Sequence, residues 1–220
     1  MALTPNLTPR ALKTAVFIAA LMPLAWMIWD AFNGGLGANP VEELSRRTGH
    51  WALRLLLVTL AVTPLRRFSG WNPLARVRRM LGLFTFFYVC IHLTIYLVLD
   101  ASLDPANILD DVVKRRYLTV GFATFLMLLP LAITSTDAMQ HRLGGRRWRR
   151  LHRLAYFSAG GGLLHFLWLI KADYSRPLLY LTVAAVLLGL RLPWLASRLA
   201  RIQPTRRLKE WRAPPLARRA

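Results

Sequence analysis

Two histidines lie deep within hydrophobic stretches of this chain, where an imidazole without a partner would be costly. His92 lies in GLFTFFYVCIHLTIYLVL and His165 lies in AYFSAGGGLLHFLWLI. An imidazole at membrane depth can bind a metal ion, carry a proton or hydrogen-bond to a neighbouring helix, and an ionisable ring in such a place is a functional hypothesis by default. The chemistry available depends on which helices carry the two rings and on how deep each ring lies.

The composition predicts a membrane protein built from helices. Of the 220 residues, 55% are hydrophobic, yet the net charge is +20, and the apolar residues form long blocks with the charges between them. Blocks long enough to cross about 30 Å of hydrocarbon indicate an all-α bundle of six transmembrane helices. The six predicted spans cover residues 12–29, 51–65, 81–99, 118–134, 151–170 and 178–195. The second is the weakest, because it is short, carries Arg54 and ends at Pro64.

The charges between the predicted spans test this count, because short cytoplasmic loops are enriched in Lys and Arg. The amino terminus carries +2, residues 66–79 and 135–153 carry +5 each, and the tail from residue 191 carries +8. The alternate loops 30–49, 100–117 and 171–177 carry −1, −1 and +1. Six spans with both termini in the cytoplasm place the basic segments on one side of the membrane. Five or seven spans would not keep all the basic segments on one side.

The basic segments RRFSGWNPLARVRR and HRLGGRRWRRLHR are each anchored between two apolar spans. We interpret them as orientation signals that contact anionic membrane lipids, and nucleic-acid binding is not expected. The chain is expected to form one membrane domain over residues 1–197, followed by a basic cytoplasmic tail over residues 198–220. No Walker, GxGxxG or CxxC pattern is present, so the sequence indicates no nucleotide-binding domain.

The third and fifth predicted spans run in the same direction, so the depths of their histidines can be compared by counting residues. At 1.5 Å per residue, His92 lies roughly 17 Å and His165 roughly 21 Å from the start of its span. Both rings are therefore expected at one level, past the midplane toward the outer face. Two imidazoles at one depth on different helices can supply both axial ligands of a haem iron, and the glycines at 160–162 would let a planar group or another backbone come close. The alternative is that each histidine only hydrogen-bonds to another helix.

His152 precedes His165 by about 20 Å along a helix, which suggests a second ligand near the inner face. The intervening residues turn a helix by about 1300°, which leaves the two rings about 140° apart. A partner on the third span would be expected near residue 79, where the sequence reads Arg78, Arg79 and Met80. His152 could therefore contact a propionate or a quinone, complete a haem with another ligand, or belong to a basic cluster at the interface.

Three further polar side chains are interpreted by position. Arg54 lies about one turn inside the second predicted span, where it either snorkels to the surface or pairs with a haem propionate. His50 and His141 fall at predicted loop or interface positions and are expected to be solvated.

Several segments together resemble one family. TPLRR follows the second predicted span, RRMLGLFTFFYVCIHLTIY enters the third, RRYLTVG enters the fourth, and LPLAITSTDAMQHRLGGRRWRRLHRLAYF and HFLWLIK follow. Over about residues 12–195 the chain is similar to the MsrQ (YedZ) family, the haem-binding membrane subunits of bacterial periplasmic methionine sulfoxide reductase systems. This family belongs to the wider ferric reductase-like transmembrane group.

The resemblance implies a b-type cytochrome of the bacterial inner membrane that takes electrons from the quinone pool. It would pass them to a periplasmic molybdopterin catalytic partner in a heterodimer, without a catalytic residue of its own. The family pattern places haem ligands at positions that match His92, His152 and His165, and it implies FMN besides haem b. The residues locate neither an FMN site nor a quinone pocket. The chain departs from the larger ferric reductases and NADPH oxidases, because it lacks their cytosolic FAD/NADPH domain and a second histidine on the third span, so direct NAD(P)H oxidation is not expected.

Two other functions fit the same sequence features. A haem-free small transporter or assembly factor could use the buried histidines to move protons or metal ions. Against it, no carboxylate lies within a predicted span and no internal repeat is evident. A cytochrome of the same fold could instead serve another acceptor, such as a ferric chelate or oxygen.

Overall fold

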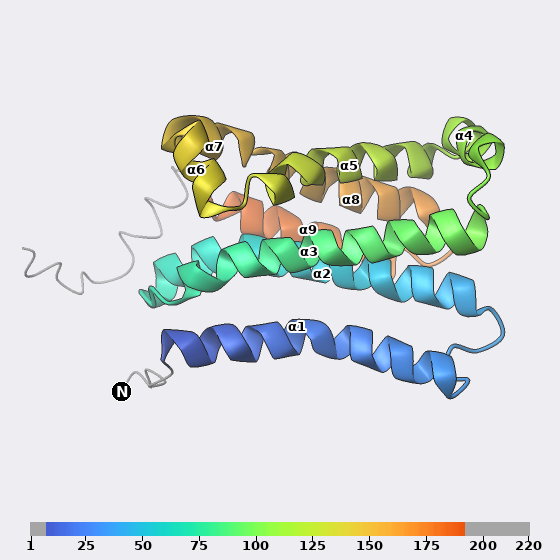
Figure 1. The fold of residues 1–220 in the computed structure, drawn as a ribbon, viewed down its shortest axis with the longest axis horizontal. Helices are drawn as coiled ribbons and strands as arrows, with labels where there is room; N and C mark the ends of the chain where they lie inside the picture. Colours follow the sequence, from blue (N-terminus) through green and yellow to red (C-terminus); the bar gives the residue numbers. More distant parts are fainter. Residues whose placement is uncertain (1–7, 192–220) are drawn as a thin grey trace, which may run out of the picture.

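The computed structural model describes residues 8–191, and within them every regular element is helical (Figure 1). In chain order these elements are α1 (Pro9–Phe32), α2 (Pro40–Ser69), α3 (Leu74–Ile95), the π-helical turn η1 (Tyr96–Asp100), α4 (Pro105–Lys114), α5 (Arg116–Ile133), α6 (Asp137–Leu143), α7 (Gly145–Leu151), α8 (Leu154–Leu169) and α9 (Ser175–Gly189). The predicted domain boundary at residue 197, the end of the sixth predicted span and the basic tail over 198–220 lie outside the described residues.

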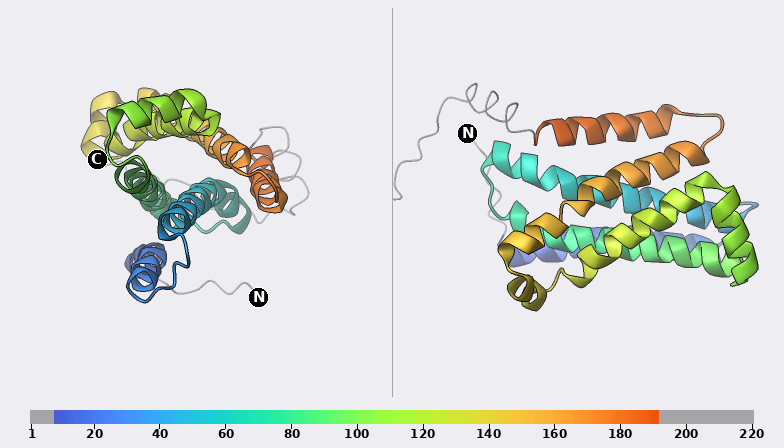
Figure 2. Two further views of the ribbon diagram at one scale, coloured as in Figure 1. Left: turned by 90° about the vertical axis from the view of Figure 1, so that its right-hand side faces the viewer. Right: turned by 90° about the horizontal axis from the view of Figure 1, so that it is seen from above.

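Helices α1, α2, α3, α5, α8 and α9 run side by side in one bundle, and α4, α6 and α7 lie at its ends (Figures 1 and 2). Four segments are long and apolar enough to cross a membrane: Arg10–Phe32, Pro40–Ser69, Leu74–Asp100 and Arg116–Ile133. The remaining bundle helices, α8 and α9, are apolar but shorter, at 16 and 15 residues. The chain is therefore an all-α membrane protein, and six crossings stay a prediction.

The connections divide between the two ends of the bundle in the way the charges predict. Figure 1 shows α6, α7 and the α2–α3 connection at one end, and α4 with the α1–α2 connection at the other. The first end carries the two loops of +5 charge, and the second carries the two loops of −1. Between the ends, large apolar side chains face outward, among them Trp26, Leu126 and Phe157. So extensive an apolar surface suits lipid rather than water.

The second predicted span belongs to the longest of these helices, so the prediction that it is short and ends at Pro64 was wrong, whereas its hydropathy is the lowest of the four candidate spans, in line with the prediction that it is the weakest. α2 begins after Asn39, whose side chain accepts a hydrogen bond from the Glu42 backbone N–H at 3.3 Å, with Pro40 in the first turn. Proline costs no hydrogen bond there, and the acidic residues of that turn stabilise the positive end of the helix. Hydropathy alone missed these start signals, which extend the helix through a segment predicted as a loop.

Two hydrophobic clusters hold the bundle together, and α2 contributes to both. On one side α1 and α3 pack against it, and the buried Tyr88 hydroxyl of α3 donates a hydrogen bond to the Ala20 carbonyl of α1 at 2.8 Å. On the other side α8 and α9 pack against α2 through residues that include Ala159 and Ala184. Helix α5 packs mainly on α8, so that α2, α3, α5 and α8 surround a common interior space.

Candidate functional site

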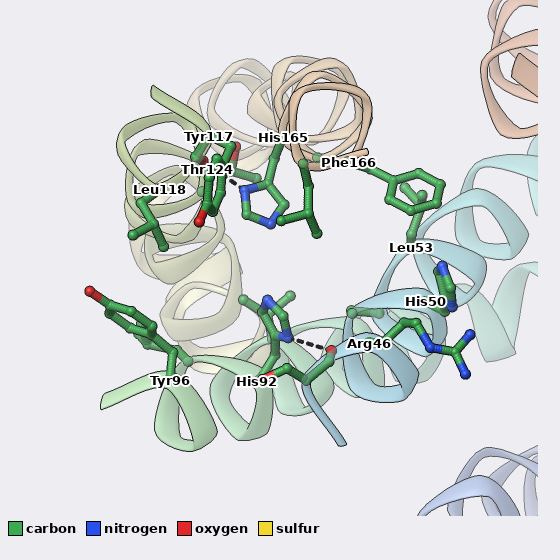
Figure 3. Close-up of a pocket in the computed structure, with 18 of the residues that line it drawn as sticks. Arg46, His50, Leu53, His92, Tyr96, Tyr117, Leu118, Thr124, His165 and Phe166 are labelled. Atoms are coloured by element: carbon green, nitrogen blue, oxygen red, sulfur yellow. Dashed lines mark hydrogen bonds between the residues drawn. The ribbon is translucent and has the colours of Figure 1, made fainter. Parts of the chain in front are cut away.

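A cavity of about 950 Å³ lies among α2, α3, α5 and α8 (Figure 3). Its wall is mainly apolar, with side chains such as Leu53, Phe125 and Leu128, and it reaches the bundle end that carries α4, where Asp100 and Asp173 border it. Cofactor and small-molecule sites typically occupy about 300–1,000 Å³ and are lined by apolar groups with a few convergent polar ones. The cavity therefore has the size and lining of a site for a large, mostly apolar ligand.

His92 of α3 and His165 of α8 face each other across this cavity (Figure 3). Their ring centres are 6.1 Å apart, and the ring planes meet at 85°. Two imidazoles that bind one metal ion from opposite sides, with metal–nitrogen bonds of about 2 Å, place their ring centres about 6.3 Å apart. The structure thus brings the two histidines to one level, as residue counting predicts, at a separation that fits a single iron atom between them.

Hydrogen bonds to backbone carbonyls orient both rings. The His92 Nδ1 lies 2.9 Å from the Ser45 carbonyl oxygen of α2, and the His165 Nδ1 lies 2.7 Å from the Tyr117 carbonyl oxygen of α5. A carbonyl can only accept, so each Nδ1 carries the proton and each Nε2 keeps a free lone pair. In Figure 3 the free nitrogens point into the space between the rings. A carbonyl behind a ligating histidine is the usual arrangement that fixes its tautomer and raises its basicity.

The donor set fits haem better than a bare metal ion. Among the residues that the structure describes, no three or more His, Cys, Asp or Glu side chains are grouped so that they could hold a metal ion. A porphyrin supplies the equatorial nitrogen ligands itself and needs only axial ligands from the protein. Two opposed neutral imidazoles in an apolar cavity between helices meet that requirement.

Cationic side chains border the open end of the cavity. Arg46 of α2, Arg115 before α5 and Arg176 of α9 all line it. Arg46 also pairs with Glu43 at 2.5 Å, and Arg115 pairs with Asp111 at 3.0 Å. These guanidinium groups can bind carboxylates that project from the cavity toward the solvent.

Arg54, the predicted partner of a haem propionate, does not line the cavity. Its Nε donates a hydrogen bond to the Tyr180 hydroxyl at 2.8 Å, and its guanidinium carbon lies 4.9 Å from the centre of the Trp51 ring. Arg46 and Arg54 are two turns apart on α2, which rotates one about 80° from the other. The structure therefore favours the other interpretation of Arg54, a guanidinium that snorkels along aromatic side chains.

His50 is half-buried in α2 and lines the cavity, so the prediction of a solvated loop histidine was wrong. Its ring packs edge-on against Phe166, with centres 5.1 Å apart, and lies nearly parallel to the Tyr180 ring at 6.4 Å. Because α2 begins at Pro40, His50 lies within the helix and inside the bundle rather than in a loop. His141 lies in α6 and is exposed, as expected.

His152 lies outside the cavity and directly follows α7, which lies at the opposite end of the bundle (Figure 1). Its ring stacks on Trp148 at 3.8 Å between ring centres, and its Nδ1 lies 3.1 Å from the Trp148 carbonyl oxygen. Arg79, which occupies the position expected for a second ligand on α3, pairs with Asp137 at 2.5 Å. Within residues 8–191 the structure therefore gives His152 no opposing histidine.

Comparisons with known proteins identify the family of the chain. Residues 48–163, about half of the chain, match the family described as ferric reductase like transmembrane component. The chain is 50% identical to the protein-methionine-sulfoxide reductase haem-binding subunit MsrQ of Herminiimonas arsenicoxydans, over 86% of this chain and 87% of that protein. It is 50% identical to MsrQ of Ralstonia nicotianae, over 86% and 90% of the two chains. For MsrQ of Rhodospirillum rubrum the identity is 47%, over 92% and 93%.

Proposed function

Because the chain belongs to the MsrQ family of haem-binding membrane subunits, we propose that it is the b-type cytochrome of a methionine sulfoxide reductase system. It takes electrons from the quinone pool of the bacterial inner membrane and passes them to a periplasmic molybdopterin catalytic partner. The reduction of methionine sulfoxide takes place in that partner, so this chain is an electron-transfer subunit of a heterodimer. FMN is an expectation that rests on the resemblance alone.

One observation carries the proposal: two Nδ1-anchored imidazoles face each other at 6.1 Å in an apolar cavity. His92 and His165 would bind haem b through their Nε2 atoms. When bound, haem supplies a one-electron iron couple. The chain's own residues hold the rings in fixed orientations, surround the space between them with apolar side chains and place guanidinium and carboxylate groups at the cavity mouth. Ligand orientation, burial and nearby charge are the means by which proteins tune a haem potential.

The position of the cavity supports the direction of electron flow. It reaches the end of the bundle that carries the acidic loops, which the distribution of Lys and Arg assigns to the periplasm. A haem held there lies close to a periplasmic acceptor. In this topology the chain crosses the membrane six times, with both termini in the cytoplasm and the basic loops against anionic lipid headgroups.

The proposal is tested with the purified full chain in lipid nanodiscs. After haem supplementation, we expect a Soret band, reduction of the haem by a quinol, and sulfoxide reduction when a periplasmic molybdoenzyme partner and an oxidised protein substrate are added. A colourless protein that is indifferent to quinol would contradict the proposal and favour the transporter. Haem that is reduced by quinol and reoxidised by ferric chelates or oxygen, but never by the sulfoxide reductase, would favour a cytochrome of the same fold that serves another acceptor.

Replacing His152 with alanine tests whether the inner histidine is a ligand. We expect the H152A variant to keep the haem-to-protein ratio of the wild type, because the His152 ring stacks on Trp148 away from the cavity. The pyridine haemochromogen assay measures the ratio, with one haem per chain expected in both proteins. A ratio that falls by half in the variant would show that His152 holds a second haem.

Replacing Arg46 or Arg176 with glutamine should weaken haem binding, because each cation lines the cavity mouth where propionates would emerge. Both side chains are exposed, so we expect a modest effect, about two- to fivefold in haem affinity per substitution. Haem titration of the apoprotein measures it. Arg54→Gln is the matched control on the same helix. A larger effect at Arg54 than at Arg46 would show that Arg54, and not Arg46, binds a propionate.

A further inference from the structure

The two histidine anchors are built in the same way on two different helices. Ser45 and Tyr117 each offer a backbone carbonyl, and the residue four positions later in each helix is a glycine, Gly49 in α2 and Gly121 in α5. The contacts also join similar sequence separations, 47 residues for Ser45 to His92 and 48 residues for Tyr117 to His165. In both helix pairs, α2 with α3 and α5 with α8, the first helix therefore supplies the carbonyl and the glycine, and the second supplies the ring that faces the cavity.

Each imidazole lies against the glycine of the neighbouring helix. A Cβ atom at Gly121 would lie 2.9 Å from Nδ1 and 3.1 Å from Cε1 of His165. A Cβ atom at Gly49 would lie 3.2 Å from Cε1 and 3.4 Å from Nδ1 of His92. The first separation is shorter than a side chain tolerates and the second is tight, so both rings occupy the space that any other residue would fill.

Helix geometry explains why the glycine follows the carbonyl by four residues. The carbonyl of residue i accepts the N–H of residue i+4, and the side chain at i+4 lies close enough to reach that carbonyl, as serine and threonine do within helices. A glycine at i+4 leaves the second lone pair of the oxygen open to a donor from another helix. A carbonyl and a glycine one turn later therefore form a seat for an imidazole N–H.

We propose that Ser45 with Gly49, and Tyr117 with Gly121, form two similarly built seats that fix the axial imidazoles at right angles, which makes Gly49 and Gly121 positioning residues for the haem. The proposal rests on the function proposed above. The observed angle of 85° between the two rings is its structural basis. Without a seat, each ring would rotate about its side-chain bonds and the angle between the planes would not be fixed.

Crossed rings have a spectroscopic consequence. When two axial imidazole planes are perpendicular, their π interactions act equally on the two iron orbitals that carry the unpaired electron, and these orbitals stay close in energy. Ferric haem then gives a strongly anisotropic low-spin EPR signal with a single dominant line at low field. Parallel rings separate the orbitals and give a rhombic spectrum of three resolved lines. The wild-type chain is expected to give the first spectrum.

The test compares Gly121→Ala and Gly49→Ala with Gly160→Ala in the full haem-loaded chain. Gly160 is the matched control, because a Cβ atom there meets nothing within 4 Å although it lies on the His165 helix. We expect Gly121→Ala to lose the crossed-ring signal and to weaken haem binding roughly 10- to 100-fold, the range for loss of a group that orients a metal ligand. Gly49→Ala should show a smaller change and Gly160→Ala none. The midpoint potential should rise in the same order, because a ring displaced from its carbonyl is a weaker donor to ferric iron.

A rhombic spectrum in the wild type, or wild-type spectra and potentials in both seat variants, would overturn the proposal. If Gly121→Ala does not give monodisperse protein, Gly49→Ala decides by the same two criteria. A wild-type chain that binds no haem would refute the proposed function itself. A chain that binds haem and accepts electrons from quinol, but shows parallel rings, would refute only the seats.

Discussion

Replacing His165 with glycine is expected to abolish stable haem binding, and replacing His92 with glycine should do the same. Each ring would supply one axial ligand from one side of the cavity, and the described residues that line it include no other histidine except His50. Loss of a carbonyl that merely supports a metal ligand costs about 10- to 100-fold in affinity, so loss of the ligand should cost at least about 100-fold. The Soret absorbance per chain after gel filtration measures the effect.

Two controls make this result specific. His141→Gly removes an exposed histidine of α6 and should leave the absorbance unchanged. Free imidazole added to His165→Gly should restore a low-spin haem spectrum, because the Tyr117 carbonyl remains to accept from its N–H. Full haem content in the His92→Gly, His165→Gly double variant would show that the iron is held elsewhere.

Replacing Gly161 with alanine is expected to destabilise the protein by about 1–3 kcal/mol, the usual cost of overpacking a tight contact. A Cβ atom at Gly161 of α8 would clash with the Thr124 Oγ1 of α5. That hydroxyl is held by its hydrogen bond to the Val120 carbonyl at 2.8 Å, so it cannot move aside without losing the bond. The two helices must separate instead, and because α5 and α8 carry one wall of the cavity, haem retention should fall as well. Unfolding by SDS, followed by tryptophan fluorescence, measures the loss.

A second substitution should rescue this variant. Thr124→Ala removes the atom that clashes and leaves the Thr124 Cβ at 3.5 Å, an ordinary contact. The double variant should therefore be more stable than the sum of the single effects predicts, by about 1–2 kcal/mol of coupling energy. Gly160→Ala, its neighbour in sequence, meets open space and should be neutral or slightly stabilising, since alanine favours a helix over glycine. Strict additivity of the two substitutions would show that Gly161 and Thr124 do not define the distance between these helices.

The histidine pair shows what can be predicted by counting residues along the sequence. Equal depth on parallel helices follows from a fixed rise per residue, and the structure places the His92 and His165 rings 6.1 Å apart. The same counting said nothing of the carbonyls and glycines behind the rings, because Ser45, Gly49, Tyr117 and Gly121 lie on other helices. A signal for one seat was present in the sequence: Asn39, Pro40 and the acidic residues after them mark a helix start that carries Gly49 and His50 into the bundle.

The sequence by itself determined that the chain is a helical membrane protein, which end of the bundle is basic, and that His92 and His165 lie at one level. These properties depend only on where a residue lies along a helix axis. Hydropathy, charge and the rise per residue fix that position from the neighbouring sequence alone. The tertiary structure decided which side chains share the cavity. Arg46, not Arg54, lines it, His50 joins it, and His152 does not. The reason is rotation about the helix axis, which depends on packing against partners distant in the chain and which no count of residues along a single helix can supply.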